Sequence, residues 1–143
     1  MRCNNYYLLN DPTRNSEYAL DRNQTNGFCD TDWNTSPDWQ GPGWYRMSLP
    51  SGNTIPEEPV EPFHCNSQAP GWLNSKHPVP GNTIDGSVCF NSAGNTCKWQ
   101  TRIKIRHCKN YFLYYLPKPP TCRLRYCASN SSLIGTKSTY ISN

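Results

Sequence analysis

The chain has 143 residues, of which 35% are hydrophobic, 13% are aromatic and eight are cysteine. This length suits a single domain, and no stretch approaches the roughly 20 apolar residues of a membrane span, which argues against direct membrane insertion. The formal net charge of +4 comes from 14 basic and 10 acidic residues that are interleaved, so the composition does not indicate a nucleic-acid partner.

The cysteines predict disulfide bonds, because their number is even and they are scattered along the chain. They stand at positions 3, 29, 65, 89, 97, 108, 122 and 127. Disulfides persist in oxidising compartments, so we expect an extracellular location, secreted or on a cell-surface ectodomain. The first residues lead into the cysteines without an apolar signal core, which suggests a piece of a larger multidomain protein. Eight cysteines allow 105 pairings, and their number selects none of them.

The first half of the chain predicts two short strands separated by long polar loops. Residues 6–9 form a β-prone run that ends in Asn-Asp-Pro, a turn signature. Residues 11–43 resemble a surface loop pinned by Cys29 and by two tryptophans, Trp33 and Trp39. Residues 44–47 are the second strand, and the Pro-rich acidic run that follows at 55–62 excludes a helix.

The second half predicts more strands. Residues 69–81 suggest a succession of turns around a buried tryptophan, and 88–90 and 97–99 suggest two strand ends joined by a small polar loop. A local bridge between Cys89 and Cys97 fits that hairpin. Strict alternation over 102–106 predicts a half-buried strand. The continuous aromatic run 111–116 predicts a strand in the sheet interior, which Pro-rich sequence then ends.

These features together predict the fold class. We expect a mainly β, single compact disulfide-rich module with long loops, in which a small α content is possible. The module covers residues 1–127, and residues 128–143 form a polar tail or linker that is rich in Ser, Asn and Thr. There is no internal repeat and no amphipathic helix of useful length.

Several separate motifs from Cys3 to Cys127 resemble the eight-cysteine extracellular module of the uromodulin and zymogen-granule membrane glycoprotein family. They are Cys3 with the Leu-Asn-Asp-Pro that follows, Cys29-Asp30-Thr31-Asp32, Gly43-Trp44-Tyr45-Arg46, Cys65 to Ala69-Pro70, Trp72-Leu73-Asn74 with His77-Pro78, Tyr114-Tyr115-Leu116, Pro119-Pro120-Thr121-Cys122 and Tyr126-Cys127. Many matches in the same order make the resemblance specific. It implies an extracellular, mainly β module of a mosaic protein.

The resemblance also implies a disulfide pairing. Carried over by position, the pairs are Cys3 with Cys108, Cys29 with Cys122, Cys65 with Cys127, and Cys89 with Cys97. One family member carries a further pair, whose two positions correspond to Pro59 and Thr96 here. Both partners are therefore missing together, as expected where a lone thiol is reactive.

Vertebrate members of the family present an N-linked, mannose-rich glycan that captures fimbrial adhesins of bacteria. The family's acceptor position falls within 115–118 of this chain, which contains no asparagine. Three other acceptor sequences occur, at Asn23, Asn34 and Asn130, all in segments expected to be surface loop or tail. Pro37 follows closely after Asn34 and weakens that acceptor.

No residue pattern predicts an enzyme, a metal site or a cofactor. His64 and His107 adjoin cysteines, but structural zinc sites usually show closely spaced cysteine pairs. Cys122 and Cys127 have four residues between them, but the family resemblance places both in disulfides, which leaves no thiolate for a metal. Glu57, Glu58 and Glu61 offer carboxylates for glycoside chemistry, although solvated charges on a Pro-rich loop are the simpler interpretation. The chain also lacks the nucleophile turn Gly-x-Ser-x-Gly.

A row of cations is the most distinctive candidate surface. Arg102, Lys104 and Arg106 share one face of the expected strand, and Lys98 and Lys109 stand near its ends. This basic strip (Lys98, Arg102, Lys104, Arg106, Lys109) is a possible anion-binding site for sulfated glycans or acidic partners. The alternative is an edge strand whose charges prevent aggregation. Exposed Trp33 and Trp39 offer sugar-stacking surfaces, although tryptophan is more often a core or loop anchor.

The function that we expect is non-enzymatic recognition or adhesion within a larger extracellular glycoprotein. The ligand is then an extracellular protein or a glycan. The alternatives are a structural spacer that supports extracellular assembly and a glycan-presenting decoy for microbial adhesins.

Overall fold

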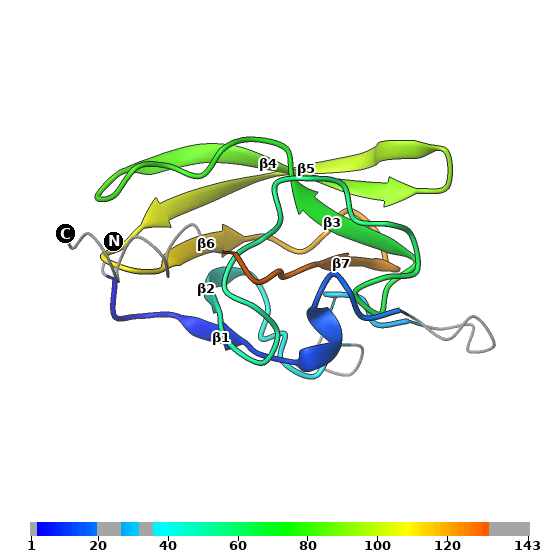
Figure 1. Cartoon of the computed structure of the whole chain (residues 1–143), viewed down its shortest axis with the longest axis horizontal. Helices are drawn as coiled ribbons and strands as arrows, with labels where there is room; N and C mark the ends of the chain where they lie inside the picture. Colours follow the sequence, from blue (N-terminus) through cyan, green and yellow to red (C-terminus); the bar gives the residue numbers. More distant parts are fainter. Residues whose placement is uncertain (1–2, 20–26, 32–35, 132–143) are drawn as a thin grey trace.

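The computed structural model describes residues 3–19, 27–31 and 36–131, and within them seven strands form one curled sheet (Figure 1). The order across the sheet is β1-β2-β6-β5-β4-β3-β7. Pairing is parallel between β1 and β2 and between β3 and β7, and antiparallel elsewhere. The elements are β1 (Tyr7–Leu9), the 3₁₀ turn η1 (Pro12–Arg14), β2 (Gly43–Met47), β3 (Ala69–Leu73), β4 (Thr83–Ser92), β5 (Asn95–His107), β6 (Phe112–Leu116) and β7 (Leu124–Tyr126).

The β4–β5 hairpin is the longest part of the sheet and appears as the twisted ribbon along the upper side of Figure 1. The predicted hairpin is confirmed, with longer strands and a tighter connection than expected. Only Ala93 and Gly94 separate the strands, and Gly94 has φ +82°, a conformation that glycine adopts without steric cost. The pairing register shifts between Phe90 and Ser92, close to the Cys89–Cys97 disulfide.

Two strands, β3 and β7, were not predicted from the sequence. The segment expected to be a succession of turns begins with β3, which pairs with β4 on one side and β7 on the other. β7 was not predicted, because its three residues are too few to show a period-two pattern. The strands expected near β1, β2 and β6 are present. The predicted mainly β fold is confirmed.

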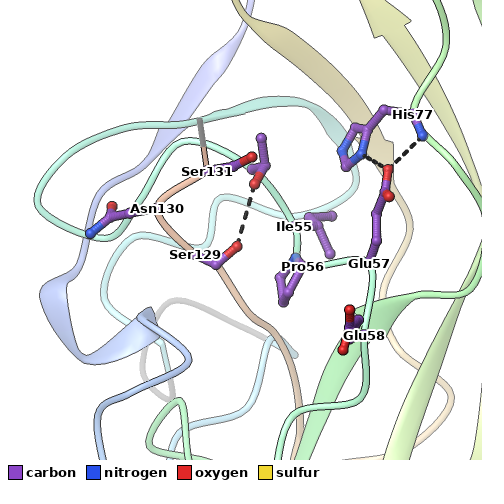
Figure 2. A pocket seen from close by; sticks show the side chains of 9 residues that line it. Ile55, Pro56, Glu57, Glu58, His77, Ser129, Asn130 and Ser131 are labelled. Atoms are coloured by element: carbon purple, nitrogen blue, oxygen red, sulfur yellow. Dashed lines mark hydrogen bonds and ion pairs between the residues drawn. The ribbon is translucent and has the colours of Figure 1, made fainter. Parts of the chain in front are cut away.

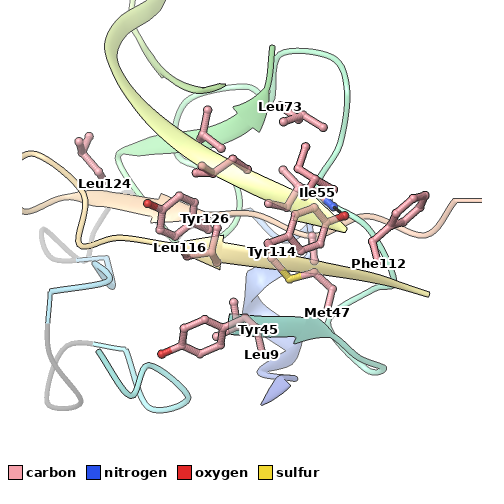
Figure 3. Close-up of a cluster of buried hydrophobic side chains, with 14 of the residues drawn as sticks. Leu9, Tyr45, Met47, Ile55, Leu73, Phe112, Tyr114, Leu116, Leu124 and Tyr126 are labelled. Atoms are coloured by element: carbon pink, nitrogen blue, oxygen red, sulfur yellow. Dashed lines mark hydrogen bonds between the residues drawn. The ribbon is translucent and has the colours of Figure 1, made fainter. Parts of the chain in front are cut away.

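The main core lies on the concave side of the curled sheet and is built from large side chains (Figure 3). Alternate residues of each strand point inward, as Ile103 and Ile105 of β5 do. The core is aromatic-rich: Tyr45, Phe90, Phe112, Tyr114 and Tyr126 are each at most 2% exposed. Such rings bury about 150 to 250 Å² each, which allows a chain poor in aliphatic residues to build a core.

Trp39 belongs to this core, which confirms its interpretation as a core or loop anchor, and the alternative of an exposed, sugar-stacking Trp39 is wrong. It is 1% exposed, and its ring stacks on Tyr45 with 5.0 Å between centroids. Trp33 lies outside the described residues. The polar loop before β2 is therefore anchored by a ring rather than lying wholly on the surface.

A second, smaller cluster packs on the opposite face of β3 and β4. Trp72 and Cys89 are cross-strand partners there and pack with Val60, Cys65 and Cys127. The indole N–H of Trp72 donates to the Thr96 carbonyl at 2.8 Å. One end of the sheet is thus covered on both faces.

The packed part of the chain continues beyond residue 127. Ala128 is fully buried, and its N–H donates to the Arg14 carbonyl at 3.0 Å. Ser129 pairs with Thr54, and the Ser131 N–H donates to the Asn53 side chain. Residues 128–131, which composition assigned to the tail, therefore pack against the rest of the module. Among the described residues there is no helix with the length and apolar character that crossing a bilayer requires.

Candidate functional site: the outer face of the sheet

The central part of the basic strip lies on the convex, solvent-facing side of β5. Arg102 and Lys104 are exposed and Arg106 is half-buried, whereas Ile103 and Ile105 between them are buried in the core. This alternation follows from the two-residue period of a strand. The structure thus brings together the three cations at the middle of the strip.

The two outlying lysines do not continue this row in the same way. Lys98 lies where the β4–β5 register shifts, and its ammonium is 5.7 Å from the centroid of the Trp99 ring. Lys109 follows the end of β5 in the turn before β6. Both are exposed, but only Arg102, Lys104 and Arg106 stand in strand register.

The edge-strand alternative is wrong for Lys104 and Arg106, because β5 is paired there with both β4 and β6. At Arg102 the strand is paired with β4 alone, since the pairing with β6 begins at Lys104. Prevention of edge-to-edge pairing therefore does not explain Lys104 and Arg106, which have neighbouring strands on both sides. Their side chains instead form part of a broad outward-facing surface.

Four side chains from four strands form a transverse row across this surface. Lys104 is the cross-strand partner of Asp85 on β4 and of Tyr115 on β6, and Tyr115 is in turn the partner of Trp44 on β2. The order is therefore carboxylate, ammonium, phenol and indole. With about 4.8 Å between strands, the row spans roughly 14 Å. We call this row and the neighbouring Ser87, Gln100, Arg102 and Arg106 the outer face.

The charges on the outer face are partly paired. The Lys104 ammonium lies 2.7 Å from the Asp85 carboxylate, and this hydrogen bond is the main reason that the pKa of Asp85 is lowered. Arg106 donates to the Gly81 carbonyl and the Thr83 hydroxyl. The side chains of Lys104 and Asp85 are 57% and 76% exposed, so solvent screens their pair and an anionic ligand has access to it.

The aromatic part of the outer face was missed by sequence interpretation. The run 111–116 was correctly predicted as an interior strand, and within it Phe112, Leu113, Tyr114 and Leu116 are buried. Tyr115, however, is 38% exposed and meets Trp44 edge-on, with 5.6 Å between ring centroids. A run that is apolar at every position carries no alternation to show which ring faces solvent.

A second candidate region is a cavity of about 410 Å³ beside the Pro-rich acidic run (Figure 2). Glu57 does not extend as a free solvated charge here, contrary to expectation: its carboxylate accepts from both the backbone and the ring of His77, at 2.8 and 2.6 Å. Despite partial burial, these bonds lower the pKa of Glu57. Glu58, which is exposed, points away from His77 in Figure 2.

The eight cysteines form four disulfides, and the pairs are those that the family resemblance implies: Cys3–Cys108, Cys29–Cys122, Cys65–Cys127 and Cys89–Cys97. Every cysteine sulfur is thus committed to a disulfide. His64 and His107 bond to backbone carbonyls, of Ser16 and Pro78 respectively. Within the described segments no group of acidic, histidine or cysteine side chains has a metal-binding arrangement.

Of the three glycan acceptors, Asn23 and Asn34 lie outside the described residues. Asn130 is exposed and lies at the rim of the cavity in Figure 2. The backbone next to it is fixed, because Asn53 bonds to both the N–H and the carbonyl of Ser131.

A curled β-sheet held by four disulfides defines the class of protein, an extracellular disulfide-bonded module. A sequence model of the uromodulin-like domain family matches residues 45–128. The chain belongs to this family.

Known proteins agree with this assignment. The chain is 33% identical to the pancreatic secretory granule membrane major glycoprotein GP2 of Mus musculus over 91% of its own length and 23% of the relative. It is 35% identical to GP2 of Homo sapiens over 87% of the chain and 21% of the relative. It is 33% identical to uromodulin of Mus musculus over 94% of the chain and 19% of the relative. The chain thus spans about a fifth to a quarter of these relatives.

Proposed function

We propose that this module is a non-enzymatic recognition unit that binds an acidic extracellular ligand through its outer face. The observation that carries the proposal is the position of Arg102 and Lys104, which stand exposed on the same face of β5 and in register with β4. An exposed basic surface attracts polyanions and raises their rate of association. Such a unit serves adhesion within a larger mosaic glycoprotein.

Two features support binding rather than catalysis. The partly buried carboxylate of Glu57 is already engaged by His77 and, at 3.7 Å, by Lys76, so it is occupied in holding the loop. All eight sulfur atoms are in disulfides, which are neither nucleophiles nor ready metal ligands. The acidic run and the cysteines therefore fit structural roles.

Chromatography on immobilised heparin tests the proposal. We expect retention at low salt, and we expect Arg102→Ala/Lys104→Ala/Arg106→Ala to abolish it, because phosphate-like and sulfate anions bind through such cations in a salt-dependent way. The matched comparison is Arg102→Ala/Lys104→Ala against Lys76→Ala/Arg123→Ala. Each double variant lacks two exposed positive charges. If both variants elute from heparin at the same salt concentration, retention depends only on net charge, and a defined binding face is refuted.

A second candidate function is glycan presentation, which the exposed Asn130 beside a fixed backbone favours. Glycopeptide mapping of the secreted protein tests Asn23, Asn34 and Asn130 together. Loss of microbial binding on enzymatic deglycosylation, with heparin retention unchanged, would assign recognition to the sugar. A spacer role predicts instead that neither the protein surface nor the glycans bind any extracellular ligand.

A further inference from the structure

The outer face combines cations with exposed rings, and the rings need their own explanation. Tyr115 is the exposed member of a strand whose other four residues are buried. Trp44 lies beside it on β2, half-buried, with its ring tilted 72° from that of Tyr115. Exposed aromatic pairs on a rigid sheet are typical of binding surfaces, because their rings bury much area at little cost in side-chain entropy.

The ring pair is continuous with the charged groups. Tyr115 is the direct cross-strand neighbour of Lys104. Arg102 lies two residues before Lys104 on the same face of β5. A ligand that packs on Tyr115 thus has its next group within reach of an ammonium and a guanidinium. A ligand that fits this surface therefore needs both a group that packs on an aromatic ring and an anionic group beside it.

Neutral polar groups complete the surface next to Arg102. Its partner on β4 is Ser87, whose hydroxyl accepts a hydrogen bond from the exposed Gln100 amide. Hydroxyl and amide groups of this kind exchange hydrogen bonds with the hydroxyls of a sugar. The Asp85 carboxylate accepts a hydrogen bond from the Lys104 ammonium. When an anionic ligand binds Lys104 in its place, Asp85 is free to accept a hydrogen bond from a sugar hydroxyl.

We infer that the outer face is a binding site for a linear sulfated polysaccharide, in which sulfate groups are bound by Arg102 and Lys104 while a pyranose ring packs its C–H face on Tyr115, beside the Trp44 ring. The inference rests on the proposed acidic-ligand function and specifies its ligand class. A flexible acidic peptide has carboxylates for the cations but no sugar ring whose C–H face can pack on Tyr115.

The test compares two probes, a heparin-derived hexasaccharide and a polyglutamate of similar charge, by titration calorimetry at fixed ionic strength. Tyr115→Thr removes the ring and keeps a residue suited to a strand. We expect it to weaken hexasaccharide binding about fivefold or more and to leave polyglutamate binding unchanged. Tyr115→Phe, which keeps the ring, retains hexasaccharide affinity. Arg102→Ala weakens binding of both probes.

The outcomes separate this inference from the proposed function. If Tyr115→Thr binds hexasaccharide as well as the parent protein, while the triple alanine variant does not bind, the face is a simple polyanion strip and the saccharide inference is overturned. Equal weakening for both probes would also overturn it, since the ring then acts only by placing Lys104. Failure of the parent protein to bind either probe would reject both proposals. Near-ultraviolet circular dichroism establishes that each variant is folded.

Discussion

Arg14 has a buried environment that its polar sequence context does not indicate. It stands in a polar loop, yet it is fully buried, and its guanidinium binds Asp30 through both terminal nitrogens at 2.8 and 3.0 Å. It also binds Asp38, the Ser36 hydroxyl and the Tyr126 carbonyl. Burial alone lowers the pKa of Arg14, but the two carboxylates outweigh burial and raise it. The pKa of Asp38, which burial raises, is lowered overall by Arg14.

Removal of Arg14 should therefore be costly. We expect Arg14→Met to destabilise the protein by about 3 to 5 kcal/mol, because Asp30 and Asp38 stay buried without the guanidinium that hydrogen-bonds both of them. Urea unfolding with the disulfides intact measures the change. The control is Lys76→Met, since the Lys76 side chain is 92% exposed and its loss should have a small effect. A cost below about 1 kcal/mol for Arg14→Met would contradict the role assigned to this network.

His77 is a second buried group with a defined set of partners. Its ring nitrogens lie 2.6 Å from Glu57 and 2.8 Å from the Tyr114 hydroxyl, which accepts from the Ile55 N–H. A neutral ring that donates from Nδ1 to Glu57 and accepts at Nε2 from Tyr114 satisfies every group. Burial is the largest influence and lowers the pKa of His77; Glu57 opposes this, and His107 adds to it.

The direction of this shift sets a pH dependence. Because the pKa of His77 is lower in the folded protein than its ordinary value of 6.5, its contribution to stability is complete above that pH and is lost as the pH falls below it. Glu57, whose pKa is also lowered from 4.5, adds a further loss only at more acid pH. We expect His77→Gln to flatten the decline in stability between about pH 7 and pH 5. Urea unfolding across that range checks this, with His64→Gln as the control, because His64 is not among the groups that shift the pKa of His77; an unaltered slope in His77→Gln would refute it.

At the scale of elements, the strands with alternating or continuous apolar patterns were predictable and β3 was not. Its Ala-Pro-Gly sequence indicates a turn. The strand tolerates Pro70 because pairing with β4 begins only at Gly71, while the bonds to β7 use the Ala69 N–H and the Gly71 carbonyl. The missing N–H of proline therefore breaks no ladder bond. Such tolerance depends on where neighbouring strands start, which no local sequence pattern records.

Only part of the candidate site could be predicted from the sequence. Alternation placed Arg102, Lys104 and Arg106 on one face, but the neighbours of that face come from strands distant in sequence. Asp85, Tyr115 and Trp44 reach Lys104 only through the registers of three strand pairs. A motif can reveal a row along one strand, whereas a row across strands requires the sheet order.

Gly71 shows how tightly β3 is held between its neighbours. A Cβ atom there would lie 2.7 Å from the Phe90 ring and 3.0 Å from both the Arg125 carbonyl oxygen and a Val88 methyl. We expect Gly71→Ala to destabilise the protein by about 1 to 3 kcal/mol through overpacking. At Gly43 the added atom would meet only the Tyr7 ring, at 3.3 Å, and that half-exposed ring can move. Chemical unfolding that ranks Gly43→Ala as the more damaging change would contradict this account of β3.

For the whole molecule, the disulfides connect segments that no local pattern brings together. Three of the four close long separations, of 105, 93 and 62 residues, and the fourth spans only 8. Cross-links restrict the unfolded chain more when they close longer loops. The sequence alone allows 105 pairings, so the resemblance to a known module was needed to specify one.

The difference in loop length gives a quantitative prediction. In the chain-entropy description, the link over 105 residues stabilises the fold by about 2 kcal/mol more than the link over 8 residues. We therefore expect Cys3→Ala/Cys108→Ala to lower the free energy of unfolding by about that much more than Cys89→Ala/Cys97→Ala. Each pair has one buried and one half-buried member, so the cavities left behind are comparable. Urea unfolding of both double variants under non-reducing conditions tests the ranking. If the variant without the 8-residue link is the less stable one, packing of the cluster around Trp72, rather than restriction of the unfolded chain, dominates the contribution of these bonds.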